Sequence, residues 1–188
     1  NHSFGWQRAT ELPDFLPSWE YATYYNMAMQ NMSKQDAYLP EQIQKYKDGS
    51  DPDNYPNVNH LKWLLESGSG FQHQHNVSIQ GGNATTSYNL SIGYRNQEGL
   101  TAKTSNERMT ALFSLRSQLS KSLTLSLNIN AYNNKYNAPN GEPTSIDGII
   151  GYAVREAPIY AGQKSDGSFG YQDNYSPEAW LASESFVE

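Results

Sequence analysis

The sequence contains no cysteine among its 188 residues, and this absence removes several chemistries at once. Without thiols the chain has no disulfide framework, no thiolate nucleophile and no cysteine-ligated zinc site. Charged residues are sparse at 17%, and the 13 basic side chains form no patch. The formal charge of −6 and the absence of a basic patch argue against binding to nucleic acid or to an anionic lipid surface. No run of 18 apolar residues occurs and the mean hydropathy is −0.76, which excludes a membrane-spanning helix.

Tyrosine is abundant, with 14 residues against 6 phenylalanines. Amphipathic rings of this kind suit surfaces that contact glycans and also the belts of a membrane interface. Helical segments are expected over residues 18–32, 41–47, 60–66 and just after Ser176. Their predicted caps are Ser18, Asn59 and Ser176, with Pro40 opening the second helix and Gly49 ending it. Residues 146–156 fit either a short helix or a strand.

The apolar positions recur with a period of two between residues 71 and 132, which predicts four β-strands at 72–80, 87–96, 108–119 and 123–132. Leu112 and Ser117 are the two breaks in this alternation. The apolar sets are Val77 and Ile79; Tyr88, Leu90, Ile92 and Tyr94; Met109, Ala111, Phe113, Leu115 and Leu119; and Leu123, Leu125, Leu127, Ile129 and Ala131.

Loop lengths must place these sets on one face, because a slip of one residue turns a strand over. A three-residue loop at 120–122 would pair Leu119 with Leu123, whereas a two-residue loop would pair Leu119 with Thr124 and is rejected. A six-residue loop at 81–86 would pair Ile79 with Tyr88. The sequence therefore predicts a continuous antiparallel meander with one apolar face.

The alternation fits a sheet packed on a protein core, and it also fits strands that face lipid. The last two strands run ten to twelve residues, near the 9–11 that a tilted strand needs to cross a bilayer. Short turns alternate with longer connections, as they do in outer-membrane barrels.

Several segments, ordered and correctly spaced between about 19 and 180, make the sequence resemble the SusC/RagA-type TonB-dependent outer-membrane transporters of Bacteroidota. The segments are Glu20-Tyr21-Ala22 with Tyr25-Asn26, residues 43–46, 49–57, 74–82, 91–99 and 115–119, and Asn174-Tyr175-Ser176-Pro177. The sequence departs from the family pattern at Met27, where Glu is usual, and at Asn59-His60, where Asp-Trp is common.

The resemblance implies an all-β fold, in which the meander is a piece of a transmembrane barrel of about 22 strands with short helices in long extracellular loops. It places the end of strand 1 at residues 1–11, an extracellular loop at 12–70, strands two to five at 71–135 and a second loop at 136–188. The plug domain of the family has no counterpart in residues 1–188.

No catalytic constellation is found in the sequence, so no enzyme activity is expected. No cofactor or metal is expected either, since His73 and His75 lack a third ligand nearby in sequence and the acidic loop at 51–62 lacks the Gly and Glu of a calcium site. The polar parity of the strands supplies candidates for contact with substrate in the lumen: Asn89, Arg95, Arg108, Arg116, Asn128 and Asn130. For the three arginines, pairing with acidic groups on a plug is favoured over contact with substrate.

The resemblance implies active, TonB-dependent import of oligosaccharides or peptides across the outer membrane, with a SusD-like surface lipoprotein as partner. The TonB complex, outer-membrane lipid and the substrate are the other expected partners, and the expected location is the outer membrane of a Gram-negative cell. The alternative is a soluble or surface-attached glycan-binding β-sheet module, in which the N-terminal helices would have to cover the apolar face.

Overall fold

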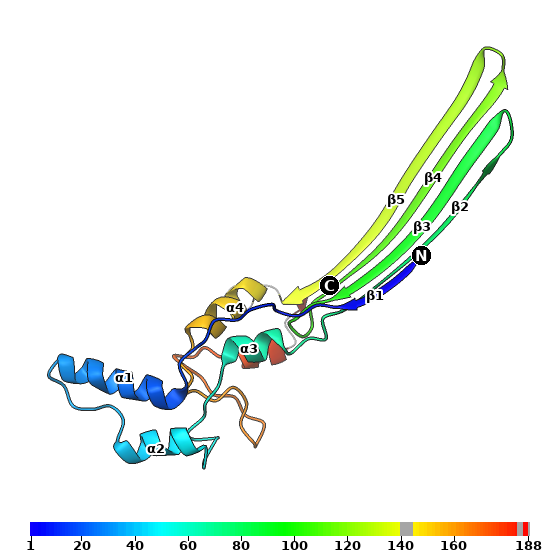
Figure 1. Cartoon of the computed structure of the whole chain (residues 1–188). Coiled ribbons are helices and arrows are strands. Elements are labelled where there is room, and N and C mark those ends of the chain that lie inside the picture. Colours follow the sequence, from blue (N-terminus) through cyan, green and yellow to red (C-terminus); the bar gives the residue numbers. More distant parts are fainter. Residues whose placement is uncertain (140–144, 184–185, 188) are drawn as a thin grey trace. The chain divides into compact units, whose positions relative to one another are not determined.

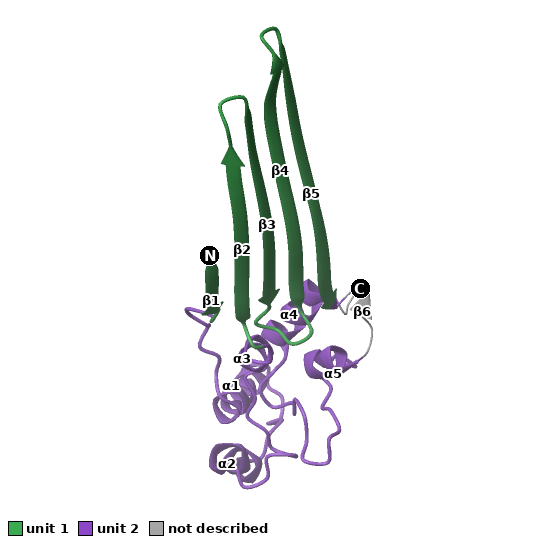
Figure 2. Cartoon of the chain, turned by 90° about the vertical axis from the view of Figure 1, so that its right-hand side faces the viewer, with its two compact units in different colours: residues 1–8, 69–138, 188 green, residues 9–68, 139–187 purple. Residues whose placement is uncertain are grey.

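The structure, a computed structural model, describes residues 1–139, 145–183 and 186–187. The chain divides into two compact units, coloured separately in Figure 2. Unit 1 comprises residues 1–8 and 69–138, and unit 2 comprises residues 9–68 and 139–187. Each unit is therefore built from two stretches of sequence. None of the described helices is long and apolar enough to cross a membrane.

Unit 1 is an antiparallel sheet whose strands follow one another in chain order (Figure 1). The strands are β1 (His2–Trp6), β2 (Phe71–Gly82), β3 (Thr86–Glu98), β4 (Ser105–Ser120) and β5 (Leu123–Pro139). These five strands do not close on one another. The predicted meander of four strands is confirmed, and its strands are longer than expected at 12, 13, 16 and 17 residues.

The register joins the apolar positions of neighbouring strands into rows across the sheet. One row runs Ile79, Leu90, Phe113 and Ile129, and the next runs Val77, Ile92, Ala111 and Ala131. The apolar set therefore shares one face, as the alternation predicts. Unit 1 is a single layer: among the described residues, Ala138 is its sole buried hydrophobic side chain.

The turn between β2 and β3 differs from the prediction. The strands stay paired to Gly82 and Ser87, so Ile79 lies opposite Leu90 rather than Tyr88. The Asn83 side chain accepts hydrogen bonds from the backbone N–H groups of Thr85 and Thr86, at 3.0 and 2.9 Å, and so tightens the turn. The register has moved by two residues, which preserves the face of every side chain.

The turn between β4 and β5 also corrects the prediction, because it has two residues rather than three. Ser120 pairs with Leu123, and a bulge between Gln118 and Ser120 absorbs Leu119. Beyond the bulge Leu115 lies opposite Leu127, the register that places both apolar sets on one face. A two-residue turn by itself would turn one strand over, and for that reason the sequence predicts a longer one. The bulge adds one residue to β4 and so keeps both apolar sets on the predicted face.

Ser117, one of the two breaks in the alternation, has a local partner on the apolar face. Its hydroxyl lies 2.8 Å from the Thr86 hydroxyl on the neighbouring strand, and the two residues are paired in the register. This cross-strand hydrogen bond satisfies both polar groups. Gly81 also lies at an apolar position of the alternation but carries no side chain. The Tyr88 ring lies over it, and a Cβ at position 81 would meet the Tyr88 hydroxyl oxygen at 2.6 Å.

Unit 2 holds helices α1 (Ser18–Asn31), α2 (Pro40–Asp48), α3 (His60–Leu65), α4 (Ile146–Arg155) and α5 (Pro177–Ala182). Residues Phe186–Val187 form the short β6. The core of unit 2 joins α3, α4 and α5 through buried Leu61, Leu64, Ile149, Ala153 and Leu181. Residues 146–155 are thus a helix, which decides between the two predicted possibilities.

The predicted cap of α1 is wrong, whereas the others hold. Ser18 lies inside the helix, Pro17 precedes it in extended conformation, and the Ser18 N–H donates to Asn57 Oδ1 at 2.9 Å. Asn59 and Ser176 accept hydrogen bonds from the first turns of α3 and α5. Gly49 ends α2 with a φ of 65°, a conformation that glycine adopts without strain.

The apolar residues of the predicted helix 18–32, which are Tyr21, Tyr24, Tyr25, Ala28 and Met32, predict a largely tyrosine face, and the buried face of α1 differs from it. Ser18, Ala22 and Asn26 are the buried residues of the helix, while Tyr24 is 55% exposed and Met32 is 56% exposed. The face is polar because Asn26 binds the segment that follows the helix. Its Nδ2 donates to the Tyr38 carbonyl at 2.7 Å, and its Oδ1 accepts from the N–H groups of Ala37 and Tyr38.

Candidate functional site

The six candidate residues predicted from the sequence all lie on the polar face of the sheet, since the register gives them one parity. Five of them fall into two groups. Asn89, Arg116 and Asn128 line a hollow of about 670 Å³ near the β2–β3 turn. Arg95 and Arg108 lie further along the strands and line a smaller hollow of about 150 Å³. Arg95 lies six positions beyond Asn89 along an extended strand, a distance of about 20 Å.

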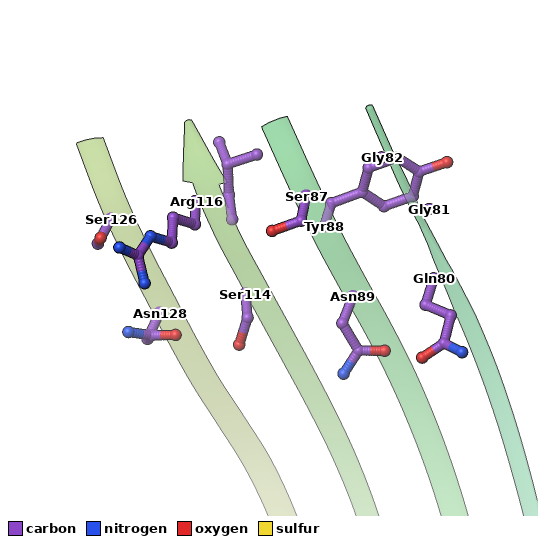
Figure 3. Close-up of a pocket in the computed structure, with 11 residues that line it drawn as sticks. Gln80, Gly81, Gly82, Ser87, Tyr88, Asn89, Ser114, Arg116, Ser126 and Asn128 are labelled. Atoms are coloured by element: carbon purple, nitrogen blue, oxygen red, sulfur yellow. The ribbon is translucent and has the colours of Figure 1, made fainter. Parts of the chain in front are cut away.

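The larger hollow is built from one row of amide and hydroxyl side chains (Figure 3). Gln80, Asn89, Ser114 and Asn128 follow one another across β2, β3, β4 and β5. The neighbouring row adds Ser87, Arg116 and Ser126. Amides and hydroxyls both donate and accept hydrogen bonds, so this surface can bind a hydroxyl-rich or a peptide ligand.

Asn130 belongs to the next row and lies opposite Leu112, the second break in the alternation. Leu112 is 46% exposed on the polar face and separates Ser91 from Asn130 along that row. The structure therefore gives Asn130 an apolar neighbour that the other asparagine candidates lack in their row.

The second group is a pair of like charges. The register places Arg95 of β3 directly opposite Arg108 of β4. Within the described part of the chain neither guanidinium has an ion pair with an acidic side chain. Arg108 lies over the Tyr132 ring, 5.8 Å from its centroid. Two unneutralised cations on neighbouring strands repel each other and attract an anionic group.

The sheet also brings a third imidazole to the histidines that the sequence singled out. His2 Nδ1 lies 2.6 Å from His75 Nδ1, and His73 Nδ1 lies 3.1 Å from His75 Nε2. These three histidines lie at the apolar parity of β1 and β2, next to Phe4. Strand pairing, which joins residues more than 70 positions apart, supplies the neighbour that the local sequence does not show.

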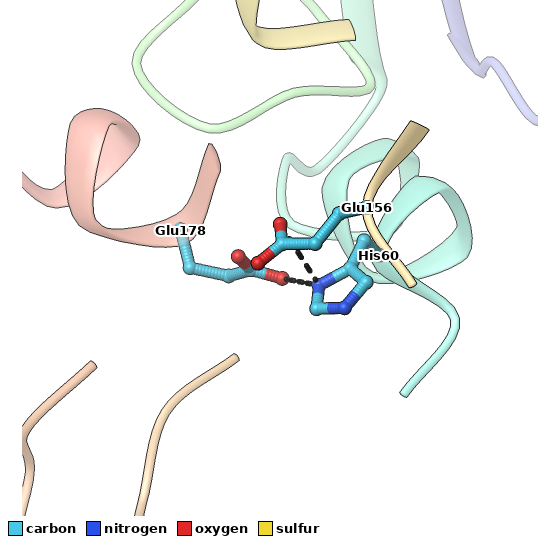
Figure 4. A group of neighbouring side chains, drawn as sticks. All are labelled: His60, Glu156 and Glu178. Carbon is cyan, nitrogen blue, oxygen red and sulfur yellow. Dashed lines mark hydrogen bonds and ion pairs between the residues drawn. The ribbon is translucent and has the colours of Figure 1, made fainter. Parts of the chain in front are cut away.

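A separate cluster, which the sequence analysis missed, lies in the interior of unit 2 (Figure 4). His60 begins α3, Glu156 follows the last residue of α4, and Glu178 lies in the first turn of α5. His60 Nδ1 lies 2.6 Å from Glu178 Oε1 and 3.6 Å from Glu156 Oε2. Their side chains are 1%, 3% and 0% exposed for His60, Glu156 and Glu178.

The electrostatics of this buried cluster follow from two carboxylates that share one imidazole. Burial raises the pKa of Glu156 to about 7, against the opposing effect of His60, and the charge of Glu178 adds to the rise. Burial by itself lowers the pKa of His60, but the hydrogen bond to Glu178 and the two carboxylate charges raise it above its ordinary value. At neutral pH these shifts favour a protonated His60 beside a carboxylate and a Glu156 that is partly protonated.

The polar atoms of the cluster are incompletely satisfied. Among the described residues, both oxygens of Glu156, Oε2 of Glu178 and Nε2 of His60 are buried without a hydrogen-bond partner. Such groups are rare in folded proteins because each loses its hydration without compensation. The sequence offers no local signal for this arrangement, since 118 residues separate His60 from Glu178.

The chain matches no protein-family model, and no curated protein matches it. The resemblance to the SusC/RagA-type transporters therefore stays a prediction that rests on the quoted segments.

Proposed function

We propose that this chain forms part of the barrel of a SusC/RagA-type outer-membrane transporter, which imports oligosaccharides or peptides. The observation that carries the proposal is the apolar face of the sheet, which continues in register over four strands. Each of these strands is longer than the 9–11 residues that cross a bilayer at a tilt.

The exposure of this face supports a lipid environment. Val77, Ile79 and Ile92 are 59%, 56% and 54% exposed, and Leu123 to Ile129 on β5 are exposed at every apolar position. Contiguous apolar surfaces of this kind are uncommon on proteins that face water. Facing lipid, the same side chains would need no protein layer over them.

The opposite face supports a polar lumen. The row of Gln80, Asn89, Ser114 and Asn128 offers donors and acceptors that match sugar hydroxyls and peptide groups. An open sheet exposes unpaired backbone groups at its edges, which lipid does not tolerate. The proposal therefore includes further strands that complete the barrel, together with the TonB complex and a SusD-like lipoprotein as partners.

The rival is a soluble or surface-attached glycan-binding module, in which helices cover the apolar face. Tyr25, one of the α1 rings that could help to do so, packs within unit 2 instead. Tyr25 packs edge-on against Tyr38 at 5.7 Å between centroids, and Tyr46 packs against Tyr38 and Tyr55. This packing between α1, α2 and the following loop favours the transporter over the binding module.

The test uses the absence of cysteine from residues 1–188, so that an introduced thiol is the only one in this part of the protein. Any cysteine elsewhere in the full protein is first replaced by serine. Ile92→Cys and Ser91→Cys place a spin label on the apolar and on the polar face of the same strand. The full protein is produced in a Gram-negative cell and labelled in isolated outer membranes. We expect the label at position 92 to collide with membrane-dissolved oxygen and the label at position 91 to collide with a water-soluble nickel chelate.

Two results would contradict the transporter. A label at position 92 that is reached by the nickel chelate would mean that the face lies in water. A label at position 92 that neither reagent reaches, in protein released without detergent, would mean that the face is covered by protein, as in the binding module.

A further inference from the structure

We propose that His60, Glu156 and Glu178 form a binding site for a divalent transition-metal ion of the zinc type, with three protein ligands. The three donor atoms, one from each residue, lie within 4.8 Å of one another. This proposal does not depend on transport, because all three residues belong to unit 2 and none lies on the sheet.

The first argument is charge. With His60 neutral and both carboxylates ionised, the form that would bind a metal, the cluster carries two negative charges, and the three side chains are at most 3% exposed. Buried charge is costly unless it is paired or bound to a metal. A divalent cation would neutralise the cluster, whereas His60 in its protonated form neutralises one of the two carboxylates.

The second argument is the unpartnered carboxylate. Glu156 is almost fully buried, and its Oε2 points toward His60 Nδ1 at 3.6 Å (Figure 4). Neither of its oxygens has a hydrogen-bond partner within the part of the chain that the structure describes. An ion held between Glu156 and His60 would give this carboxylate the ligand it lacks.

The geometry fits a small ion. Two atoms bound to one zinc ion at about 2.0–2.1 Å lie roughly 3.3 Å apart in a tetrahedral site. The separation of 3.6 Å between His60 and Glu156 is close to this value. The 2.6 Å contact between His60 and Glu178 is that of a hydrogen bond, and it opens when the ion replaces the shared proton.

The donor types select among cations. Calcium and magnesium prefer all-oxygen sites, while an imidazole nitrogen combined with carboxylate oxygens suits zinc and its neighbours in the first transition row. Three protein ligands leave a fourth position for water. The absence of thiols is no obstacle, because zinc accepts nitrogen and oxygen ligands.

A cavity lies beside Glu156. Glu156 lines a cavity of about 190 Å³ together with Tyr152, Arg155, Gln172, Asp173 and Tyr175. Glu156 is therefore shared by the cavity and the buried cluster. Once bound, the ion would tie α3 to the segments around α4 and α5, which come from the other stretch of unit 2.

The test measures binding of Zn²⁺ and Co²⁺ to the full protein in detergent after removal of metals with a chelator. We expect one tightly bound equivalent, a higher thermal midpoint and, for Co²⁺, visible absorption bands of low-symmetry coordination. Glu156→Gln keeps the side-chain shape and removes a ligand charge. It should weaken binding by more than about 100-fold, since even partners outside the ligand set contribute 10–100-fold.

Two controls separate this site from other binding. Glu66→Gln removes an exposed carboxylate just after α3 and should leave the affinity unchanged. The double variant of His73→Gln with His75→Gln removes two histidines of the sheet and should also leave it unchanged. Loss of binding in the double variant, with retention in Glu156→Gln, would overturn the proposal, and so would the lack of a tightly bound equivalent.

A second measurement locates the ion without any substitution. Hydrogen exchange of the unsubstituted protein, with and without Zn²⁺, should slow in α3 and α5 and remain unchanged in β2 to β5. Exchange that slows in β1 and β2 alone would assign the ion to the histidines of the sheet and would contradict the site in unit 2. This measurement holds even if Glu156→Gln fails to fold.

Discussion

Arg95 and Arg108 lie directly opposite each other on β3 and β4, and neither has an acidic partner within the described residues. Side chains opposite each other on neighbouring strands have Cβ atoms about 4.5–5.5 Å apart, so the two charges repel. The pair therefore lowers the stability of the sheet that carries it. Such a pair on a functional face is suited to receive an anionic group from a ligand or from another part of the protein.

The first prediction follows from this repulsion. Arg95→Gln, which leaves the contact of Arg108 with the Tyr132 ring in place, should stabilise the protein by about 0.2–1 kcal/mol in low salt, measured as the denaturant midpoint of the full protein in detergent. The gain should shrink in about 1 M salt, where the screening length is about 3 Å. Arg116→Gln is the matched control, because Arg116 lies between Ser87 and Ser126 rather than opposite a cation. An equal gain from both variants would contradict the pairwise repulsion.

The buried side chain of Asn26 gives the second prediction. Asn26→Ala removes the acceptor of the Ala37 and Tyr38 N–H groups and the donor to the Tyr38 carbonyl. We expect a loss of about 1–3 kcal/mol in the free energy of unfolding, because buried backbone groups lose their partners. Urea unfolding measures the loss, with exposed Asn31→Ala as the control. A loss no larger than that of Asn31→Ala would show that the Asn26 contacts do not stabilise unit 2.

The third prediction concerns alkaline pH. Burial raises the pKa of Tyr38 from 10.0 to about 12, and neighbouring tyrosines add to the rise: Tyr21, Tyr46, Tyr160 and Tyr25. Because the folded state has the higher pKa, the stabilisation is complete below pH 10 and declines as the pH rises from about 10 through about 12. The thermal midpoint should fall less steeply over this range in Tyr38→Phe than in the unsubstituted protein.

The control for this pH dependence is Tyr24→Phe, which removes a phenol from an exposed position on α1. In Tyr24→Phe the thermal midpoint should fall with rising pH as steeply as it does in the unsubstituted protein. An identical decline in Tyr38→Phe would mean that another group causes it.

The fourth prediction rests on the proposed membrane location. Phe113→Arg places a cation in the apolar row of Ile79, Leu90 and Ile129, whereas Ser114→Arg places one in the polar row. If the apolar face lies in lipid, Phe113→Arg should lower the free energy of unfolding by about 2–4 kcal/mol, and Ser114→Arg should change it little. Reversible unfolding of the protein from phospholipid vesicles measures both. Equal costs would argue against lipid on the apolar face.

The faces of the strands could be predicted from the sequence, whereas the partners across β2 and β3 could not. Alternation determines which side chains share a face, and a shift of two residues leaves that unchanged. The pairing of Ile79 with Leu90 depends instead on the Asn83 side chain, which tightens the turn. The bulge at Leu119 could not be predicted either. The two-residue turn and the extra residue in the bulge together restore the predicted register between β4 and β5.

The candidate sites show the same division. The polar face and its arginines follow from parity, but the separation into two hollows depends on the register. The cluster of His60, Glu156 and Glu178 depends on the packing of α3, α4 and α5, and no spacing in the sequence indicates it. The α1 stripe was misassigned for a related reason: Asn26 is buried because it binds backbone, which its polarity does not suggest.

The Gln7 N–H donates to the Gly70 carbonyl at 2.8 Å, so the segment 9–68 leaves the sheet and returns to it at neighbouring points. The entropy of closing such a segment grows only slowly with its length. Insertions, deletions or exchange of residues 9–68 can therefore alter what this segment presents to its surroundings while β1 and β2 keep their register. The junction at Gln7 and Gly70 thus separates the length of the segment that carries α1 to α3 from the pairing of the strands.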